Sequence, residues 1–299
     1  MLIAITGATG LVGSYTVPRL KAAGHRVRAL VRRTSRREPI AAYVDQWTLG
    51  DFYDPQAQAG LVAGVDCVIH AAADWTSLES SPVIHANRNV LASLQLLDAA
   101  RQASVAQFIF VSSGAVYHEI LQDRKLDENH PTWPKDIYGA GKVAVEAFLK
   151  AYHYQFGMNT CAFRPVAIYG VDPVLDKSQW VKVIRDVKAG KGIAETGGGK
   201  IVSVNDVADA LVYAVDDPQV AGRFYNLVDR HMYWQVAAEI AREIAGSASV
   251  IEDRQGSGPK NTYDTRSAVE FFDRHGNAKA LRRGLGGVRE YITELLQLL

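Results

Sequence analysis

Several residue types and patterns are scarce in this chain, and each scarcity excludes a class of protein. Cysteine occurs only at Cys67 and Cys161 among 299 residues, each within a short apolar run typical of a buried strand. We therefore expect buried free thiols rather than a disulfide-bonded secreted scaffold. No stretch approaches the roughly 18 apolar residues that a membrane-spanning helix needs, so no membrane span is predicted.

An excess of charge of one sign is also lacking. The 33 basic and 32 acidic residues nearly cancel, which gives no indication of a nucleic acid or an anionic membrane as partner. Histidine, cysteine and acidic residues form no cluster with metal-ligand spacing, so we predict no metal site. The N-terminus has no basic segment, and glycine soon interrupts its apolar run. We therefore expect no signal peptide and a cytoplasmic location.

Short apolar runs alternate with helix-like segments over the first two-thirds of the chain. The expected strands are Leu2–Ile5, Arg26–Val31, Gln46–Leu49, Cys67–His70, Gln107–Ser112 and Thr160–Pro165, and the expected helices are Leu11–Ala23, Gln56–Val62, Pro82–Ala103 and Ile137–Phe156. Continuously apolar strands that alternate with helices indicate a parallel sheet covered on both faces. With right-handed crossovers, this predicts an α/β fold with a Rossmann-type doubly wound sheet.

The pattern loosens after Tyr169, which predicts a second, smaller part of the molecule. A loop rich in aspartate and proline is followed by a helical segment, the glycine-rich stretch 190–200, and further helices toward the C-terminus. We expect residues 1–170 to form the dinucleotide-binding domain, with 202–228 returning to its sheet. Residues 171–201 and 229–299 are expected to form a small C-terminal substrate-binding domain.

Three glycines follow the first expected strand and precede the first expected helix. Gly7, Gly10 and Gly13 have the spacing Gly-x-x-Gly-x-x-Gly. Such glycines allow a sharp turn, close approach of the backbone to a pyrophosphate, and close packing of helix on strand. The helix N-terminus adds free N–H groups and a positive dipole end. The alternative is a tight turn that binds no ligand.

The end of the second strand indicates which dinucleotide binds. Arg32 opens a run with four arginines in six residues, and no acidic residue precedes Glu38. A guanidinium there suits the 2′-phosphate of NADP, whereas an acid would bind the ribose hydroxyls of NAD. We therefore predict NADP, with NAD as the alternative; a solvated basic loop is the plain structural interpretation. Asp51, after the third strand, is expected near the adenine unless it is simply a turn residue.

Tyr138 and Lys142 lie four residues apart on one face of an expected helix. Tyrosine is a poor base at neutral pH, but a nearby ammonium and an oxidised nicotinamide would lower the pKa of its phenol. The phenol could then exchange a proton with a substrate oxygen while the nicotinamide exchanges a hydride. Ser113, at the end of an expected strand, is predicted to hold the reacting oxygen. An ordinary surface pair remains the alternative for Tyr138 and Lys142 taken alone.

These residues together resemble the extended short-chain dehydrogenase/reductase family, also described as the NAD-dependent epimerase/dehydratase family. The similar segments are residues 6–13, Gly50-Asp51, His70–Ala73, Asn89-Val90, Ser113, Tyr138-x-x-x-Lys142, Arg164–Gly170, Val204–Ala208 and Asp264–Ala268. The resemblance implies Ser113, Tyr138 and Lys142 as the catalytic set, with Lys142 also on the nicotinamide ribose. With the residues above, it implies cofactor contacts by Gly7, Thr9, Gly10, Leu11, Val12, Arg32, Asp51, Phe52, Ala71, Ala72, Ala73, Asn89, Ser112, Tyr138, Lys142, Pro165, Ala167 and Ile168.

Two departures from the family pattern bear on the substrate. Ala167 stands where nucleotide-sugar enzymes usually carry asparagine, and His118 stands where glycine is usual. Arg32 resembles the dihydroflavonol-reductase and hydroxysteroid-dehydrogenase side of the family. We therefore predict an NADP-preferring oxidoreductase acting on a small or medium carbonyl or alcohol. A sugar epimerase or dehydratase holding NAD, and a non-catalytic dinucleotide-binding regulator, are the alternatives. By analogy with the family, helices 82–103 and 137–156 would form a homodimer interface.

Overall fold

A computed structural model describes residues 1–252 and 261–299, and its larger part is built on one parallel sheet. The strands are β1 (Leu2–Thr6), β2 (Arg26–Val31), β3 (Gln46–Leu49), β4 (Cys67–His70), β5 (Gln107–Val111), β6 (Asn159–Pro165) and β9 (Phe224–Leu227). Their order is β3-β2-β1-β4-β5-β6-β9, and every neighbouring pair is parallel. The predicted α/β fold with a doubly wound parallel sheet is therefore confirmed.

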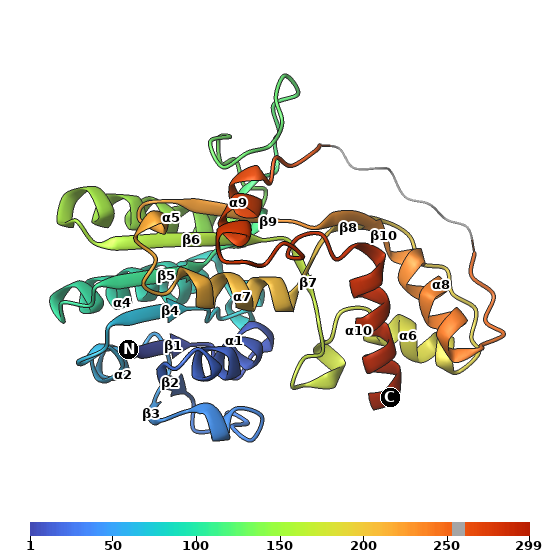
Figure 1. Cartoon of the computed structure of the whole chain (residues 1–299), viewed down its shortest axis with the longest axis horizontal. Helices are drawn as coiled ribbons and strands as arrows, with labels where there is room; N and C mark the ends of the chain where they lie inside the picture. The colour runs from blue at the N-terminus through green and yellow to red at the C-terminus, as the bar shows by residue number, and fades with distance from the viewer. Residues whose placement is uncertain (253–260) are drawn as a thin grey trace.

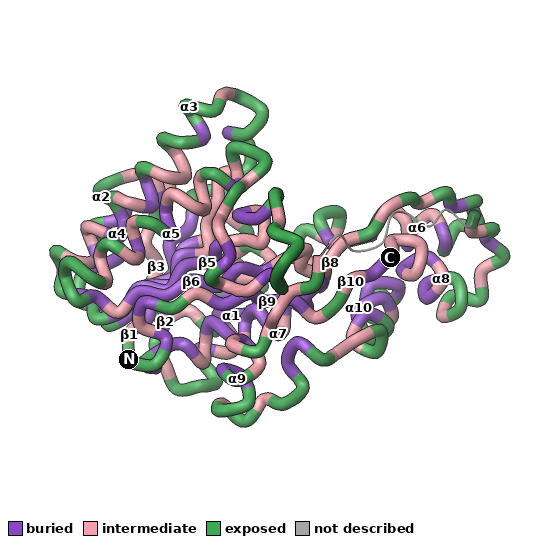
Figure 2. Tube along the Cα trace, turned by 90° about the horizontal axis from the view of Figure 1, so that it is seen from above, coloured by how far each residue is buried: buried purple, intermediate pink, exposed green. Residues whose placement is uncertain are grey.

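Helices cover both faces of this sheet, as buried strands require. Helices α1 (Leu11–Ala22), α7 (Val204–Ala214) and α9 (Arg266–Arg274) contribute to one apolar core, and α2 (Pro55–Val62), α4 (Ala92–Gln102) and α5 (Ile137–Phe156) to the other. Alternate residues of β1 enter the two cores: Ile3 and Ile5 enter one, and Ala4 the other. Figure 2 shows the buried segments concentrated along these strands.

The smaller part is a separate sheet covered by three helices (Figure 1). Its strands β7 (Ala167–Tyr169), β8 (Gly198–Ser203) and β10 (Arg230–Tyr233) pack with α6 (Val181–Lys188), α8 (Trp234–Ala245) and α10 (Gly284–Leu298) around a third apolar core. Strand β8 lies in the middle of this sheet and pairs in parallel with β7 and antiparallel with β10. Among the described residues, no helix is long and apolar enough to cross a membrane.

The two parts are divided differently from the predicted boundaries. Strand β7 lies within the residues expected to form the dinucleotide domain, but it belongs to the smaller sheet. Strand β8 belongs to the smaller sheet as well, although its last residues were expected to return to the larger sheet. Helix α9 was expected in the smaller part, yet Phe271 and Phe272 are fully buried in the larger core. The boundaries differ because only one or two residues separate β6 from β7 and β9 from β10, so the chain leaves the larger sheet without a loop that the sequence pattern would reveal. Residues 253–260 of the expected smaller part lie outside the described residues.

The expected helix 82–103 is present as one helical run over residues 82–102, and it contains a π-helical turn. It consists of α3 (Pro82–His85), a π-helical turn η3 (Ala86–Leu91) and α4. The adjacent side chains of Arg88 and Asn89, both in η3, bind Asp74 in the loop after β4. Such single π-turns are often found at functional sites, and this one carries the predicted cofactor residue Asn89.

Candidate functional site

The turn between β1 and α1 has the shape that a dinucleotide needs. Gly7 has φ of 70°, and a Cβ there would lie 2.8 Å from the backbone of Ala71. A Cβ at Gly13 would lie 2.2 Å from the Gly7 oxygen, so only glycine lets α1 pack this closely on the turn. Gly10 caps α1 without a side-chain hydrogen bond, and the first turn carries no acidic residue. The free N–H groups of this twelve-residue helix therefore fit a pyrophosphate.

Residues predicted to line the cofactor surround this turn. Thr9, Leu11 and Val12 are half-buried around the start of α1, and Ala71, Ala72 and Ala73 are half-buried after β4. Phe52 is only 8% exposed and its ring packs against His70. Hence the Phe52 side chain belongs to the core, and its carbonyl accepts a hydrogen bond from Gln58.

A buried histidine that the sequence analysis did not assign connects these segments. His70 Nδ1 lies 2.7 Å from Thr6 Oγ1, and His70 Nε2 lies 2.8 Å from Ser93 Oγ. Because the Ser93 hydroxyl donates to the Asn89 carbonyl, it accepts from His70 Nε2–H, which leaves Nδ1 to accept from Thr6. Thr6 Oγ1 in turn accepts from the Ala72 N–H at 3.2 Å. Burial lowers the pKa of His70 to about 3, so its ring is neutral.

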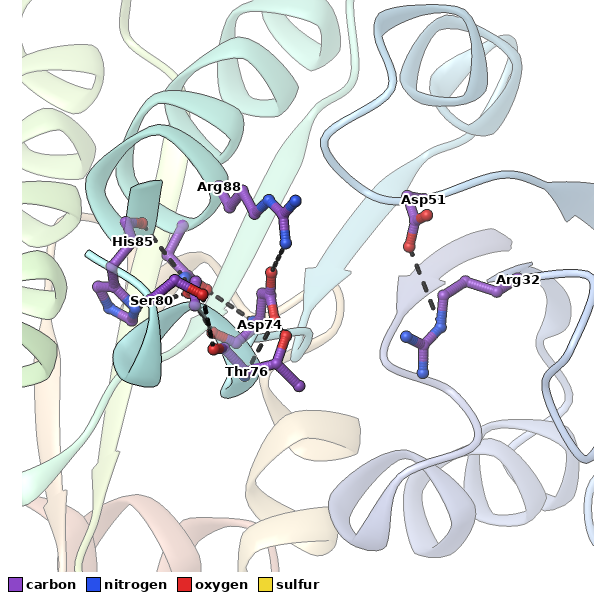
Figure 3. Close-up of polar contacts among 9 residues, drawn as sticks. Arg32, Asp51, Asp74, Thr76, Ser80, His85 and Arg88 are labelled. Atoms are coloured by element: carbon purple, nitrogen blue, oxygen red, sulfur yellow. Dashed lines mark hydrogen bonds and ion pairs between the residues drawn. The ribbon is translucent and has the colours of Figure 1, made fainter. Parts of the chain in front are cut away.

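Arg32 and Asp51 lie beside each other at the ends of β2 and β3 (Figure 3). Their Nε and Oδ1 atoms are 4.0 Å apart, and the Arg32 side chain is 69% exposed. An ion pair this exposed contributes little to stability. The guanidinium is thus free to bind another anion.

Asn89 is engaged within the protein rather than open toward a ligand. Its Oδ1 accepts from Asp74 N at 2.7 Å, and its Nδ2 lies within hydrogen-bonding distance of Ser77 Oγ and His85 Nδ1. Asp74 also receives hydrogen bonds from Thr76 and Arg88, as Figure 3 shows. His85 is itself buried. The predicted cofactor contact of Asn89 would require its amide to leave these partners.

The predicted catalytic side chains come from two elements. Ser113 follows β5 and caps a short 3-10 turn, while Asp136 caps α5 through the Gly139 N–H and so places Tyr138 in the first turn. The Ser113 side chain lies close enough to the Tyr138 phenol to oppose the rise in its pKa. A Cβ at Gly139 would lie 2.3 Å from the Ala115 carbonyl oxygen. The helix can therefore approach the Ser113 turn only because residue 139 is glycine.

The protonation of Tyr138 depends on its burial. Burial raises its pKa to about 12, although the nearby Ser113 side chain opposes the shift. The Nζ atom of Lys142 donates to the Val111 carbonyl at 2.7 Å and lies 5.6 Å from the Tyr138 ring centre. Burial lowers the pKa of Lys142 itself to about 8. Burial therefore opposes the phenolate expected from the sequence, and the lowering of the Tyr138 pKa by Lys142 together with an oxidised nicotinamide stays a prediction.

Ser112 was predicted at the cofactor, but its hydroxyl binds a buried carboxylate. It donates to Glu146 Oε1 at 2.5 Å, and Glu146 forms a two-pronged ion pair with Arg164 at 2.8 and 2.7 Å. Both side chains of the pair are at most 4% exposed. Although burial opposes its charge, the Glu146 carboxylate keeps the pKa of Arg164 above its ordinary value. The sequence analysis did not find this network, because its members are distant in the chain. The one pattern that pointed to Glu146 was its position four residues after Lys142, on the same face of α5.

The chain after β6 forms the wall opposite Ser113. A Cβ at Gly114 would lie 3.0 Å from Val166 Cγ1 and 3.4 Å from the Tyr263 hydroxyl. Pro165 ends β6 and is buried, whereas Ala167 and Ile168 are half-buried in β7. Tyr263, which the sequence analysis did not single out, brings the C-terminal segment to this turn.

Trp75 lies against Tyr138 on another side. The two rings are stacked with centres 4.6 Å apart, and Trp75 remains 58% exposed. Tyr117, in the turn after Ser113, is buried, and its hydroxyl accepts from Arg164 and donates to Asn226. In the part of the chain that the structure describes, no group of three or more histidine, cysteine or acidic residues could hold a metal.

The fold and this arrangement define a Rossmann-type dinucleotide-binding protein with a serine, tyrosine and lysine at one sheet edge. The model of the NAD dependent epimerase/dehydratase family matches residues 3–227. The chain therefore belongs to that family, an enzyme family.

Individual relatives have different activities. The chain is 29% identical over 223 residues to 3-beta-hydroxysteroid dehydrogenase of Mycolicibacterium neoaurum, covering 71% of this chain and 58% of that one. It is 29% identical over 238 residues to UDP-glucose 4-epimerase of Mycolicibacterium smegmatis, covering 75% of each. The NAD complex of Thermus thermophilus UDP-glucose 4-epimerase has a TM-score of 0.79 at 23% identity, with full coverage of both chains. At that identity the structural match shows the fold alone.

Proposed function

We propose that this chain is an NADP(H)-preferring oxidoreductase that interconverts a secondary alcohol and a carbonyl compound. The observation that carries the proposal is the proximity of Ser113, at the end of β5, to Tyr138 in the first turn of α5, with Lys142 one helical turn further along. The nicotinamide would supply or accept the hydride when bound. Tyr138 would exchange the proton with the substrate oxygen, Ser113 would orient that oxygen, and Lys142 would hold the ribose.

A protonated Tyr138 phenol is the form that carbonyl reduction needs. With a pKa of about 12, the phenol carries its proton at neutral pH. It can therefore donate that proton to the oxygen of a carbonyl as this oxygen gains negative charge. Oxidation of an alcohol would first require the phenol to lose its proton.

The proposed cofactor site extends from the glycine turn to the end of β2. Arg32 would bind the 2′-phosphate, which its 69% exposure permits, and Asp51 would lie near the adenine. The remaining proposed contacts are those predicted from the sequence: Gly7, Thr9, Gly10, Leu11, Val12, Phe52, Ala71, Ala72, Ala73, Asn89, Ser112, Tyr138, Lys142, Pro165, Ala167 and Ile168. For Ser112, whose hydroxyl is bound to Glu146, the contact would use the main chain. The smaller part would contribute to substrate binding, as predicted from the sequence, and Tyr263, in the segment before α9, would lie near the substrate because it is beside Gly114.

Replacing Tyr138 by phenylalanine tests the proposal. The Tyr138→Phe variant removes only the hydroxyl, so kcat for carbonyl reduction should fall by roughly 10²–10⁴-fold, while NADP(H) affinity stays nearly unchanged. Tyr43→Phe, the same substitution at an exposed position outside the proposed site and dimer interface, is the control and should keep full activity. Turnover retained by Tyr138→Phe would reject the assignment.

A second candidate function is that of a sugar epimerase or dehydratase with tightly held NAD. It is favoured by the relative from Mycolicibacterium smegmatis, a UDP-glucose 4-epimerase aligned over 75% of this chain. In such a reaction the hydride leaves and returns, so no net NAD(P)H is consumed. Purified protein that already carries one equivalent of NAD, and that isomerises a sugar nucleotide without a change in absorbance of the cofactor, would favour this candidate over the first.

We also propose a homodimer formed through α4 and α5. An exposed stripe along α5, consisting of Ala140, Ala147, Ala151 and Tyr154, is apolar and carries small residues that allow close helix packing. Light scattering should give the mass of a dimer for the natural chain and of a monomer for Ala147→Arg. A monomeric natural chain at micromolar concentration would contradict the dimer.

A further inference from the structure

An exposed tryptophan is placed directly against the proposed proton donor. The indole of Trp75 stacks on the ring of Tyr138 with an interplanar angle of 29°, yet 58% of Trp75 is open to solvent. A tryptophan this exposed leaves a large apolar surface in water. Because the reacting oxygen must lie within hydrogen-bonding distance of the Tyr138 hydroxyl, a substrate bulkier than its carbonyl group lies close to this surface.

The main chain on both sides of Trp75 is fixed. Asp74 accepts hydrogen bonds from Thr76 at 2.6 Å and from Arg88 at 3.0 Å, and its own N–H donates to Asn89 at 2.7 Å. On the other side, the buried Ser77 donates to the Asp74 carbonyl at 2.7 Å. Figure 3 shows Arg88 and Thr76 converging on Asp74. The indole is therefore presented by a rigid turn, and its exposed surface is not the result of a loose loop.

The partners of Arg88 strengthen this turn. Its guanidinium lies 5.3 Å from the centre of the Tyr53 ring while it binds Asp74. The turn that carries Trp75 is thus tied both to the π-helical turn and to the loop after β3. A rigid aromatic surface costs little conformational entropy when a ligand packs on it.

We propose that Trp75 is a specificity-determining residue that selects carbonyl or alcohol substrates with a flat apolar ring next to the reacting carbon. This inference rests on the proposed oxidoreductase function and names its substrate class: ketones and secondary alcohols attached to an aromatic or fused-ring system. Offset stacking on the indole and burial of the ring surface supply the selection. A short aliphatic ketone reaches Tyr138 without using the indole.

The kinetic test compares two methyl ketones that share the reacting carbonyl, naphthyl methyl ketone and propyl methyl ketone. The natural enzyme should reduce the naphthyl compound with the higher kcat/KM. Trp75→Ala should lower kcat/KM for the naphthyl ketone about tenfold, corresponding to about 1.4 kcal/mol, chiefly through KM, and change the propyl ketone less than twofold. Trp75→Phe should recover most of the loss. Trp47→Phe on the edge strand β3 is the matched control and should leave both ketones unchanged.

An equal loss for both ketones in Trp75→Ala would overturn the inference, because it would mean that Trp75 merely holds Tyr138 in place. No loss for either would overturn it as well. The cofactor-dependent shift in melting temperature shows whether each variant is folded, and Trp75→Phe provides the comparison if the alanine variant is not.

Binding of naphthol separates this inference from the proposed reaction. Naphthol should quench the fluorescence of the natural protein and of Trp47→Phe, and the quenching should be lost in Trp75→Phe. Quenching at Trp75 without reduction of any ketone would support the flat-ring site and reject the oxidoreductase. Reduction of both ketones with equal kcat/KM and no quenching at Trp75 would support the oxidoreductase and reject the flat-ring site.

Discussion

At the scale of single residues, buried polar groups hold the candidate site together. The Glu146–Arg164 pair joins α5 to β6, and the carboxylate also accepts the Ser112 hydroxyl at the end of β5. Removing one partner of such a pair leaves an uncompensated buried charge, typically costing about 3–5 kcal/mol. The pair therefore fixes the position of the helix that carries Tyr138 and Lys142.

His70 makes the stability of the protein depend on pH. Its pKa is about 3 in the folded chain and about 6.5 in an unfolded one. Between these values the unfolded state binds one more proton, so stability present at neutral pH is lost as the pH falls below about 6.5, at about 1.4 kcal/mol per pH unit. The free energy of unfolding, measured with urea, should therefore decrease less steeply with falling pH in His70→Gln than in the natural chain. The difference between the two slopes should be about 1.4 kcal/mol per pH unit.

The exposed His118 provides the comparison for this measurement. His118→Gln should keep the natural pH dependence, because its ring is in solvent. If His70→Gln and the natural chain lost stability in parallel between about pH 6 and pH 4, the neutral buried ring would not be the cause.

At the scale of elements, close approach of α5 to the Ser113 turn decides whether the site forms. Gly139→Ala would place a methyl group 2.3 Å from the Ala115 carbonyl oxygen and 2.9 Å from Pro134. Backbone cannot yield as a flexible side chain can, so we expect a loss of about 1–3 kcal/mol of stability. Separation of Tyr138 from Ser113 should also lower kcat at least tenfold, which steady-state kinetics would measure.

Gly286, in a different helix, gives a matched control for the Gly139→Ala substitution. It lies in the first turn of α10, and a Cβ there would meet nothing within 4 Å. Gly286→Ala should be neutral or stabilise the chain by up to about 1 kcal/mol, since alanine favours helix. Natural stability and kcat in Gly139→Ala would show that the contact with Ala115 is not needed.

At the scale of the whole molecule, a bound dinucleotide should stabilise the fold, because its proposed contacts come from many strands of the larger sheet. A ligand bound only by the folded chain at a hundredfold excess over Kd adds about 2.7 kcal/mol. NADP(H) should therefore raise the melting temperature more than NAD(H). Arg32→Ala should remove this difference and leave the NAD(H) effect unchanged, because it deletes only the cation beside Asp51.

Arg26, at the opposite end of the same strand, is the control for charge alone. Arg26→Ala should keep the preference for NADP(H). Equal stabilisation of the natural chain by both dinucleotides would contradict the role assigned to Arg32.

The sequence by itself determined the layered sheet, the glycine turn and the placement of Ser113, Tyr138 and Lys142 at one edge. These features depend on interactions between residues close in the chain: apolar periodicity, the spacing of three glycines, and side chains four apart on a helix. The same local rules located β1 to β6 within one residue at either end.

Only the tertiary structure decided what surrounds those residues. The partners of His70, Ser112 and Asn89, the passage of β7 and β8 into a second sheet, and the stacking of Trp75 on Tyr138 join segments far apart in sequence. Burial raises the pKa of Tyr138, an effect that spacing along the chain does not reveal. Spacing along the chain sets which side chains share a face, whereas burial and charge partners are properties of the packed molecule.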